Sequence, residues 1–241
     1  MSFETFGKDN LNMALKELGK EYRKLVGKHM PAEIILIGGA AVLENYGFRE
    51  MTTDIDAVIL ASSAMRDAIN HVGDRLHLPN GWLNDDFKKT DSYSPHLAEV
   101  SVYCKTYYGA LNVRTVSAEY LVAMKLKAGR KYKNDLSDVV GILAEHKRNG
   151  TELAEEQILA AAEKLYGRAD ALPEESRVFL SDLIGRGNYE EIYEEIRSGE
   201  SSAKDVLLEF QEAYPEVLKT DNADEILKTL RARKAAQEKS K

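Results

Sequence analysis

The spacing of apolar residues predicts a helix near the start of the chain. Leu11, Leu15, Leu18 and Tyr22 recur at steps of three and four, which places them on one face of a helix. Pro31 is expected to end this segment, because proline cannot continue a helix.

Two short apolar runs rich in branched residues, 33–37 and 55–60, predict buried strands. The first run stops at Gly38-Gly39, and a helix is expected to follow over 40–46. The polar residues Thr52-Thr53-Asp54 lead into the second run.

The next segment alternates between expected helices and strands. Alternating apolar and polar residues predict strands over 99–104 and 111–115. A loop anchored by Trp82 is expected over 77–95, which holds two prolines and many polar residues. Further helices are expected over the ranges 62–76, 117–129 and 134–147, the last capped by Asn134.

From Thr151 the composition shifts to Glu, Lys, Ala and Leu, which favours helices. We expect helices at about 152–166, 174–185, 189–197 and 202–213, with a fifth from about 223. The predicted fold class is therefore α/β (α+β), a small mixed sheet with flanking helices followed by an all-helical C-terminal domain. The predicted domains are 1–148, with its core at 33–148, and 149–241.

Composition supports a folded protein with one or two domains. The chain has 241 residues, of which 44% are hydrophobic, enough for a sizeable core. Its longest apolar runs fall far short of the ~20 residues that a membrane helix needs, and its start does not read as a signal peptide. Cys104 is the single cysteine and predicts no internal disulfide. We expect a cytoplasmic protein.

The net charge of −7 argues against extensive binding of duplex DNA, whose affinity comes from neutralised phosphates. Local basic clusters remain compatible with this charge. One such cluster consists of Lys125, Lys127, Arg130, Lys131 and Lys133.

Candidate chemistry lies at the ends of the first two expected strands. Asp54 and Asp56 are two positions apart, so both side chains project from one face of a strand. Two adjacent carboxylates repel each other unless a cation lies between them, and magnesium prefers such oxygen ligands. Gly38 and Gly39 end the preceding strand and open a helix, where backbone N–H groups can approach phosphates. We expect a right-handed connection to place these two features side by side.

The apolar residue, Gly38-Gly39, the intervening helix and Thr52-Thr53-Asp54-Ile55-Asp56 together resemble the nucleotidyltransferase (polymerase-β-like) superfamily. The resemblance implies that Gly38, Gly39 and Thr53 bind a nucleoside triphosphate, with Thr52 matching the hydroxyl before the acids. It also implies that Asp54 and Asp56 hold one or two Mg²⁺ ions.

A second stretch, 119–138, is similar to the branch that contains the abortive-infection toxin nucleotidyltransferases. This similarity implies phosphate contacts from Lys125 and Arg130, with Asp135 and Asp138 lining the site. It also implies an antitoxin protein as a partner. An alternative for the two acids is that they only favour the positive N-terminal end of their helix.

The superfamily normally has a third carboxylate, which completes a second metal site and acts as the general base. Glu99, on the expected strand 99–104, is our first choice, and Asp85 and Asp86 are alternatives. Without any of them, the site would hold one metal ion or would have lost catalysis.

The hypothesis from the sequence is magnesium-dependent nucleotidyl transfer to a hydroxyl group of a small molecule, a protein or a tRNA end. A nucleotide-binding protein without turnover is one alternative. The other is a helical interaction module on a relic nucleotidyltransferase scaffold.

Overall fold

Five strands form one mixed sheet in the order β3-β2-β1-β5-β4. The structure is a computed structural model and describes residues 5–219 and 222–238. The apolar runs of the sequence supply the central strands β1 and β2, which have few exposed residues. The strands are β1 (Ala32–Leu36), β2 (Ile55–Leu60), β3 (Leu83–Asn84), β4 (Ser101–Tyr107) and β5 (Leu111–Val116).

Strand β1 pairs antiparallel with β2 and parallel with β5. Strand β2 pairs parallel with the short β3, and β4 pairs antiparallel with β5. The prediction of a right-handed connection between β1 and β2 is wrong, because that rule applies to parallel strands. The antiparallel pairing instead brings the end of β1 directly beside the start of β2.

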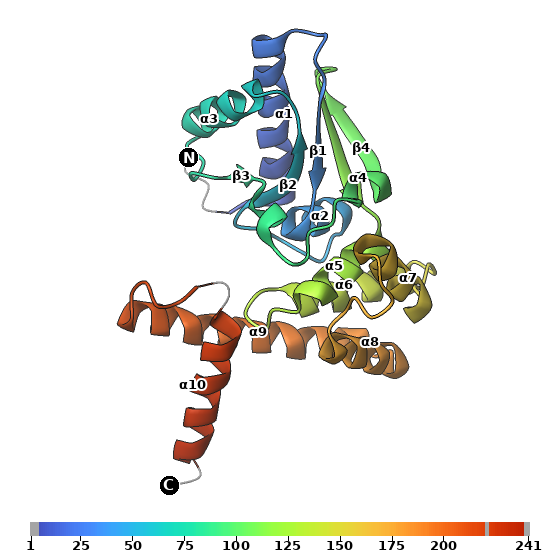
Figure 1. The fold of residues 1–241 in the computed structure, drawn as a ribbon, viewed down its shortest axis with the longest axis vertical. Helices are drawn as coiled ribbons and strands as arrows, with labels where there is room; N and C mark the ends of the chain where they lie inside the picture. Colours follow the sequence, from blue (N-terminus) through green and yellow to red (C-terminus); the bar gives the residue numbers. More distant parts are fainter. Residues whose placement is uncertain (1–4, 220–221, 239–241) are drawn as a thin grey trace.

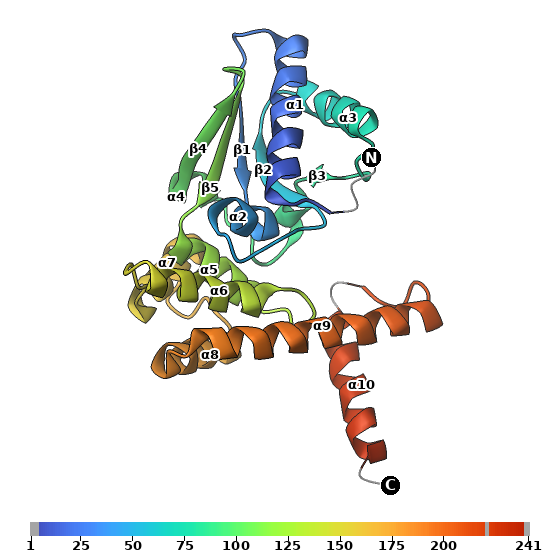
Figure 2. The same cartoon turned by 180° about the vertical axis from the view of Figure 1, so that it is seen from behind.

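Helices pack against this sheet and continue beyond it. Helix α1 (Lys8–Val26) and helix α3 (Ala64–Leu76) lie together on one face of the sheet, and α2 (Gly38–Asn45) lies at its end (Figures 1 and 2). The short helices between β3 and β4 are η1 (Asp86–Lys89) and α4 (Leu97–Val100).

After β5, the described part of the chain is mostly helical and lies beyond the end of the sheet where α2 is found (Figure 1). This arrangement confirms the predicted fold class of a mixed sheet with flanking helices and a helical C-terminal part. These helices are α5 (Ala118–Ala128), α6 (Asp135–Arg148), α7 (Glu155–Tyr166), α8 (Glu174–Arg186), α9 (Tyr189–Ala213) and α10 (Ala223–Glu238).

The prediction of two helices at 189–197 and 202–213 is wrong, because α9 runs unbroken across this region. Ser201 and Ser202 both lie exposed within the helix. Their neighbour Glu200 is buried against α6, and this contact holds the middle of α9 in place.

One main apolar core contains buried residues from Phe6 to Ile192. It includes residues on both sides of position 148. The predicted domain boundary at 148 stays a prediction. A second, smaller cluster joins α9 to α10 and consists of Ala203, Leu207, Ala223 and Leu227. No helix in the described part of the chain is long and apolar enough to cross a membrane.

Candidate functional site

The antiparallel pairing of β1 and β2 brings Gly38 next to Asp56. The Ile37 N–H donates to the Asp56 carbonyl oxygen at 3.1 Å, just beyond the paired residues Leu36 and Ala57. Gly38 has a φ of 56°, in the left-handed region that favours glycine. A Cβ atom on Gly38 would lie 3.5 Å from Asp56 Oδ2. The glycine turn and the carboxylate therefore face the same small space.

Gly39 is packed more tightly than Gly38. A Cβ atom on Gly39 would lie 2.6 Å from Thr52 Oγ1 and 2.8 Å from Arg49 Nη2. Thr52 is buried and is held in place by backbone hydrogen bonds in both directions with Phe6. Gly39 is thus needed for packing of the loop before β2, whatever its part in binding a ligand.

Asp54 and Asp56 flank Ile55 at the start of β2, as the sequence predicts. Asp54 is exposed, and its Oδ1 accepts a hydrogen bond from Thr53 Oγ1 at 3.3 Å. Asp56 is half-buried. Burial and the charge of Asp54 raise the pKa of Asp56, although nearby cations act in the opposite direction. The ionised form of Asp56 is therefore destabilised by its environment, which is the condition that a bound cation relieves.

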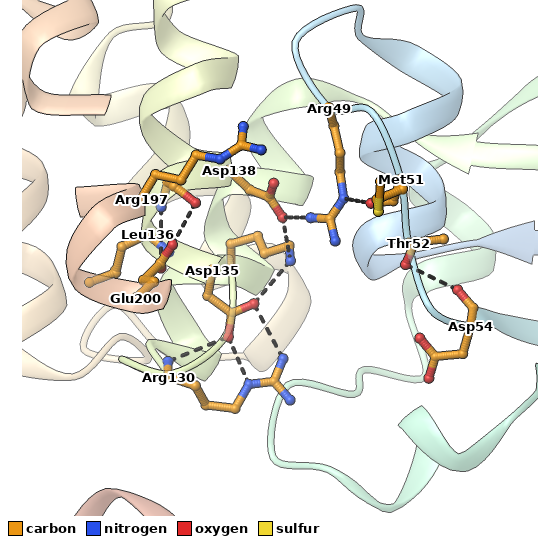
Figure 3. A network of polar contacts seen from close by, with 12 residues as sticks. Arg49, Met51, Thr52, Asp54, Arg130, Asp135, Leu136, Asp138, Arg197 and Glu200 are labelled. Atoms are coloured by element: carbon orange, nitrogen blue, oxygen red, sulfur yellow. Dashed lines mark hydrogen bonds and ion pairs between the residues drawn. The ribbon is translucent and has the colours of Figure 1, made fainter. Parts of the chain in front are cut away.

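The cations that act on Asp56 are Lys133, Arg130 and Lys125, all at or near the loop between α5 and α6. None of them forms an ion pair with Asp54 or Asp56 within the described residues. Lys125 and Arg130 are instead held by the acids of α6, and Figure 3 shows this network of ion pairs.

Asp135 lies at the centre of the network and is fully buried. Its carboxylate accepts hydrogen bonds from Lys125 Nζ at 2.9 Å and from Arg130 Nε at 2.7 Å. Burial alone would raise the pKa of Asp135, but Lys125 and Arg130 lower it well below its usual value. Asp135 is therefore ionised and fixes both cations in position.

Asp138 lies one turn further along α6, and its Oδ2 is 2.8 Å from Lys125 Nζ. Burial would lower the pKa of Lys125, but Asp138 and Asp135 together raise it. Lys125 has three donor hydrogens, so two acids leave one of them for another acceptor. The predicted phosphate contact of Lys125 stays a prediction.

The sequence did not single out Arg49, which joins the network from the opposite side. Its guanidinium pairs with Asp138, and its Nε donates to the Met51 carbonyl oxygen at 3.0 Å. Arg49 also packs against Gly39, where an added Cβ atom would lie 2.8 Å from its Nη2. It therefore links α6 to the loop before β2 (Figure 3). No local pattern could have revealed a contact between residues 89 positions apart.

Lys133 was visible in the sequence only as a member of a basic run. Burial and the Arg130 charge lower its pKa, while Asp135, Asp54 and Asp56 raise it. It makes no ion pair within the described residues, so its ammonium group remains available to a ligand near the aspartates.

Glu200 also escaped the sequence analysis. The prediction that the Asn134 side chain caps the N-terminal end of α6 is wrong. This glutamate from α9 caps it instead. Glu200 Oε1 accepts from the backbone N–H groups of Leu136 at 2.9 Å and Ser137 at 3.3 Å. Its Oε2 accepts from the Ser137 hydroxyl.

The expected place of Glu99 on a strand is wrong. Glu99 lies in α4, before β4 begins, because the backbone over 97–100 closes a helical turn. Its exposed carboxylate lies 3.2 Å from His96 Nδ1. Strand β4 is three places from β2 in the sheet, or about 14 Å at ordinary strand spacing. Glu99 therefore does not stand beside the aspartates, as a third carboxylate must.

The loop acids do not replace Glu99. Asp85 and Asp86 are exposed and pair with Lys88 and Lys89 at 3.0 and 2.6 Å. Across residues 5–219 and 222–238, no three His, Cys, Asp or Glu side chains gather into a group that could hold a metal ion.

Two carboxylates still suit one magnesium ion. Magnesium is commonly bound through one or two carboxylates, with water and substrate phosphates as its other ligands. Asp54 and Asp56 supply oxygen donors at the start of β2, next to the glycine turn, where a Cβ atom on Gly38 would lie 3.5 Å from Asp56 Oδ2. The donor set therefore fits one ion shared with a phosphate group.

A family model described as "Nucleotidyltransferase of unknown function (DUF6036)" matches residues 13–170. No curated protein and no solved structure matches the chain significantly. The matched stretch covers more than half of the 241 residues and includes the glycine turn, both aspartates and the α5–α6 network. The chain therefore belongs to this family of nucleotidyltransferases of unknown function.

Proposed function

We propose that the chain transfers a nucleotidyl group from a magnesium-bound nucleoside triphosphate to a hydroxyl acceptor. The observation that carries this proposal is the contact between Gly38 and Asp56, created by the antiparallel pairing of β1 and β2. This contact supports the proposal, because backbone N–H groups at a glycine turn are suited to phosphates and adjacent carboxylates are suited to magnesium. The family match supports nucleotidyl transfer in general.

In this proposal, each group of residues has a separate role in binding the triphosphate and magnesium. The Gly38 turn would bind the triphosphate, and Asp54 and Asp56 would hold one magnesium ion. That ion would neutralise phosphate charge and orient the α-phosphate. Lys133 and the free donor of Lys125 would stabilise the charge that develops on the phosphate oxygens.

The transfer itself is a displacement at phosphorus. The acceptor oxygen forms a bond to the α-phosphorus, and the bond from that phosphorus to the bridging oxygen breaks. Pyrophosphate leaves with the electron pair, and the hydroxyl proton passes to water. Water takes this role in the proposal because the described residues offer no third carboxylate as a base.

Replacing Asp56 with Asn tests the proposal. The change keeps the shape but removes one charge, so magnesium-dependent triphosphate binding should be lost and transfer should fall at least a hundredfold. The free energy of unfolding without ligand should stay equal or rise, because repulsion with Asp54 is relieved. The measurement is transfer of α-³²P label from each of the four triphosphates, together with thermal unfolding with and without magnesium and triphosphate.

Asp182→Asn, on the exposed surface of α8, is the matched control and should behave like the parent. Normal transfer by Asp56→Asn would contradict the proposal. Binding without transfer in the parent protein would instead favour a nucleotide-binding protein without turnover. The observation that favours this second candidate is that no third carboxylate joins Asp54 and Asp56 among the described residues.

A further inference from the structure

A groove of about 270 Å³ lies where the α5–α6 loop meets the C-terminal helices. Its apolar lining comes from α9, from Leu218 in the segment after α9, and from Ala223 at the start of α10. The lining residues are Tyr132, Lys133, Lys204, Leu207, Leu208, Leu218, Lys219 and Ala223.

Three ammonium groups surround this groove, from Lys133, Lys204 and Lys219. Within the described part of the chain, none of them pairs with a carboxylate. Asp224 is close enough to raise the pKa of Tyr132, after the larger effect of burial, but forms no ion pair with these lysines. Three unpaired cations around an apolar lining, in a chain of net charge −7, suit an anion with an apolar or planar body.

The groove adjoins the candidate active site through Lys133. The charge of this lysine acts on Asp56, and Asp54 and Asp56 act on the lysine in return. The glycine turn approaches the same aspartates from β1 and α2, which are different elements. One phosphate-bearing molecule in the groove and another at the glycine turn would therefore both lie beside the aspartate pair without occupying the same space.

We propose that the groove binds the acceptor, and that the acceptor is a nucleoside monophosphate. Its phosphate would contact Lys204 and Lys219, and its base would pack on Tyr132 and Leu208. A volume of about 270 Å³ is at the small end of ligand pockets, which suits a mononucleotide better than a macromolecule. The inference rests on the proposed function, because it names the substrate that receives the nucleotidyl group.

Binding can be measured without the donor site. The four ribonucleoside 5′-monophosphates are titrated into the full chain by calorimetry, without magnesium or triphosphate. At least one should bind more tightly than its nucleoside or inorganic phosphate. Lys204→Glu combined with Lys219→Glu should weaken this binding at least tenfold, and Leu208→Asp should weaken it too. Lys228→Glu, an exposed change on α10 outside the groove, is the matched control and should bind like the parent.

Transfer separates this inference from the proposed function. With α-³²P triphosphate and magnesium, label should move to the monophosphate. The double lysine variant should raise KM for the monophosphate at least tenfold and leave KM for the triphosphate unchanged. No transfer to any acceptor would refute the proposed function. Transfer to another acceptor, unchanged binding by the groove variants, or binding of oligonucleotides but of no monophosphate would overturn the groove assignment.

Discussion

Three cations and two anions make up the buried network between the loop before β2 and α6. Lys125, Arg130 and Arg49 carry three positive charges, against two negative charges on Asp135 and Asp138. One positive charge therefore remains in excess beside Asp54 and Asp56. This excess partly offsets the negative charges of Asp54 and Asp56, whereas Asp135 and Asp138 are already paired with cations.

Gly39→Ala should destabilise the protein even without any ligand. The added Cβ would lie 2.6 Å from Thr52 Oγ1, and Thr52 is held by its backbone hydrogen bonds with Phe6. Such overpacking costs about 1–3 kcal/mol, which urea unfolding measures directly. Gly185→Ala is the control, since nothing lies within 4 Å of its Cβ, and it should unfold at the same or slightly higher urea. Equal stability of Gly39→Ala and the parent would contradict the packing described for this turn.

At the scale of elements, apolar periodicity predicted the regular parts well. Residues 55–60 form β2 as expected, and α5, α6 and α7 begin within a few residues of the predicted positions. The pattern located Asp54, Asp56 and Gly38 because these residues lie at the ends of strongly patterned strands. It could not give the direction of β2, which depends on pairing with β1.

Contacts that are distant in sequence were beyond prediction. Arg49 and Glu200 meet α6 across 89 and 63 positions, and neither lies in a recognisable motif. Glu99 shows the opposite error. Its alternation with Val100 and Ser101 resembled a strand, but a four-residue helix forms there instead. Short patterns fit both structures, and tertiary contacts decide between them.

Glu200 should make stability depend on pH. Burial raises its pKa to about 7, even though hydrogen bonds from Ser137 and Leu136 lower it. The folded pKa is above the unfolded one, so the contribution to stability is full below about pH 4.5 and is lost as the pH rises through about 7. When protonated, Glu200 can donate from Oε2 to the Ser137 hydroxyl.

Glu200→Gln mimics the protonated form of the carboxyl group. It should therefore remove the loss of stability that the parent shows as the pH rises. The free energy of unfolding of the variant minus that of the parent should increase by on the order of 3 kcal/mol as the pH rises from 5 to 8. Urea unfolding across this range measures the difference. Glu200→Ala, which removes the cap, should be less stable than Glu200→Gln at every pH. A constant offset between parent and Gln variant would rule out titration of this carboxylate.

At the scale of the whole molecule, two cores of unequal size hold the chain together. The main core joins the sheet to α5 through α9, whereas α10 is held by a small cluster with α9. Local opening is easiest where few apolar contacts must break. Amide hydrogens of α10 should therefore exchange faster than those of α5 and α6, as measured by hydrogen exchange and mass spectrometry.

Leu227→Ala should accelerate exchange in α10 further and leave α5 unchanged, because Leu227 belongs only to the small cluster. Equal protection of α10 and α6 in the parent would show that the two cores open together.

The cap on α6 also has a consequence for synthesis. Position 200 leaves the ribosome 63 residues after Ser137, which takes about 3–13 s at ordinary elongation rates. During this interval the strands, both aspartates and Lys125 already exist, but the helix that orders the cations lacks its carboxylate partner. The newly made chain therefore acquires its full electrostatic arrangement late, once α9 has been translated and has docked.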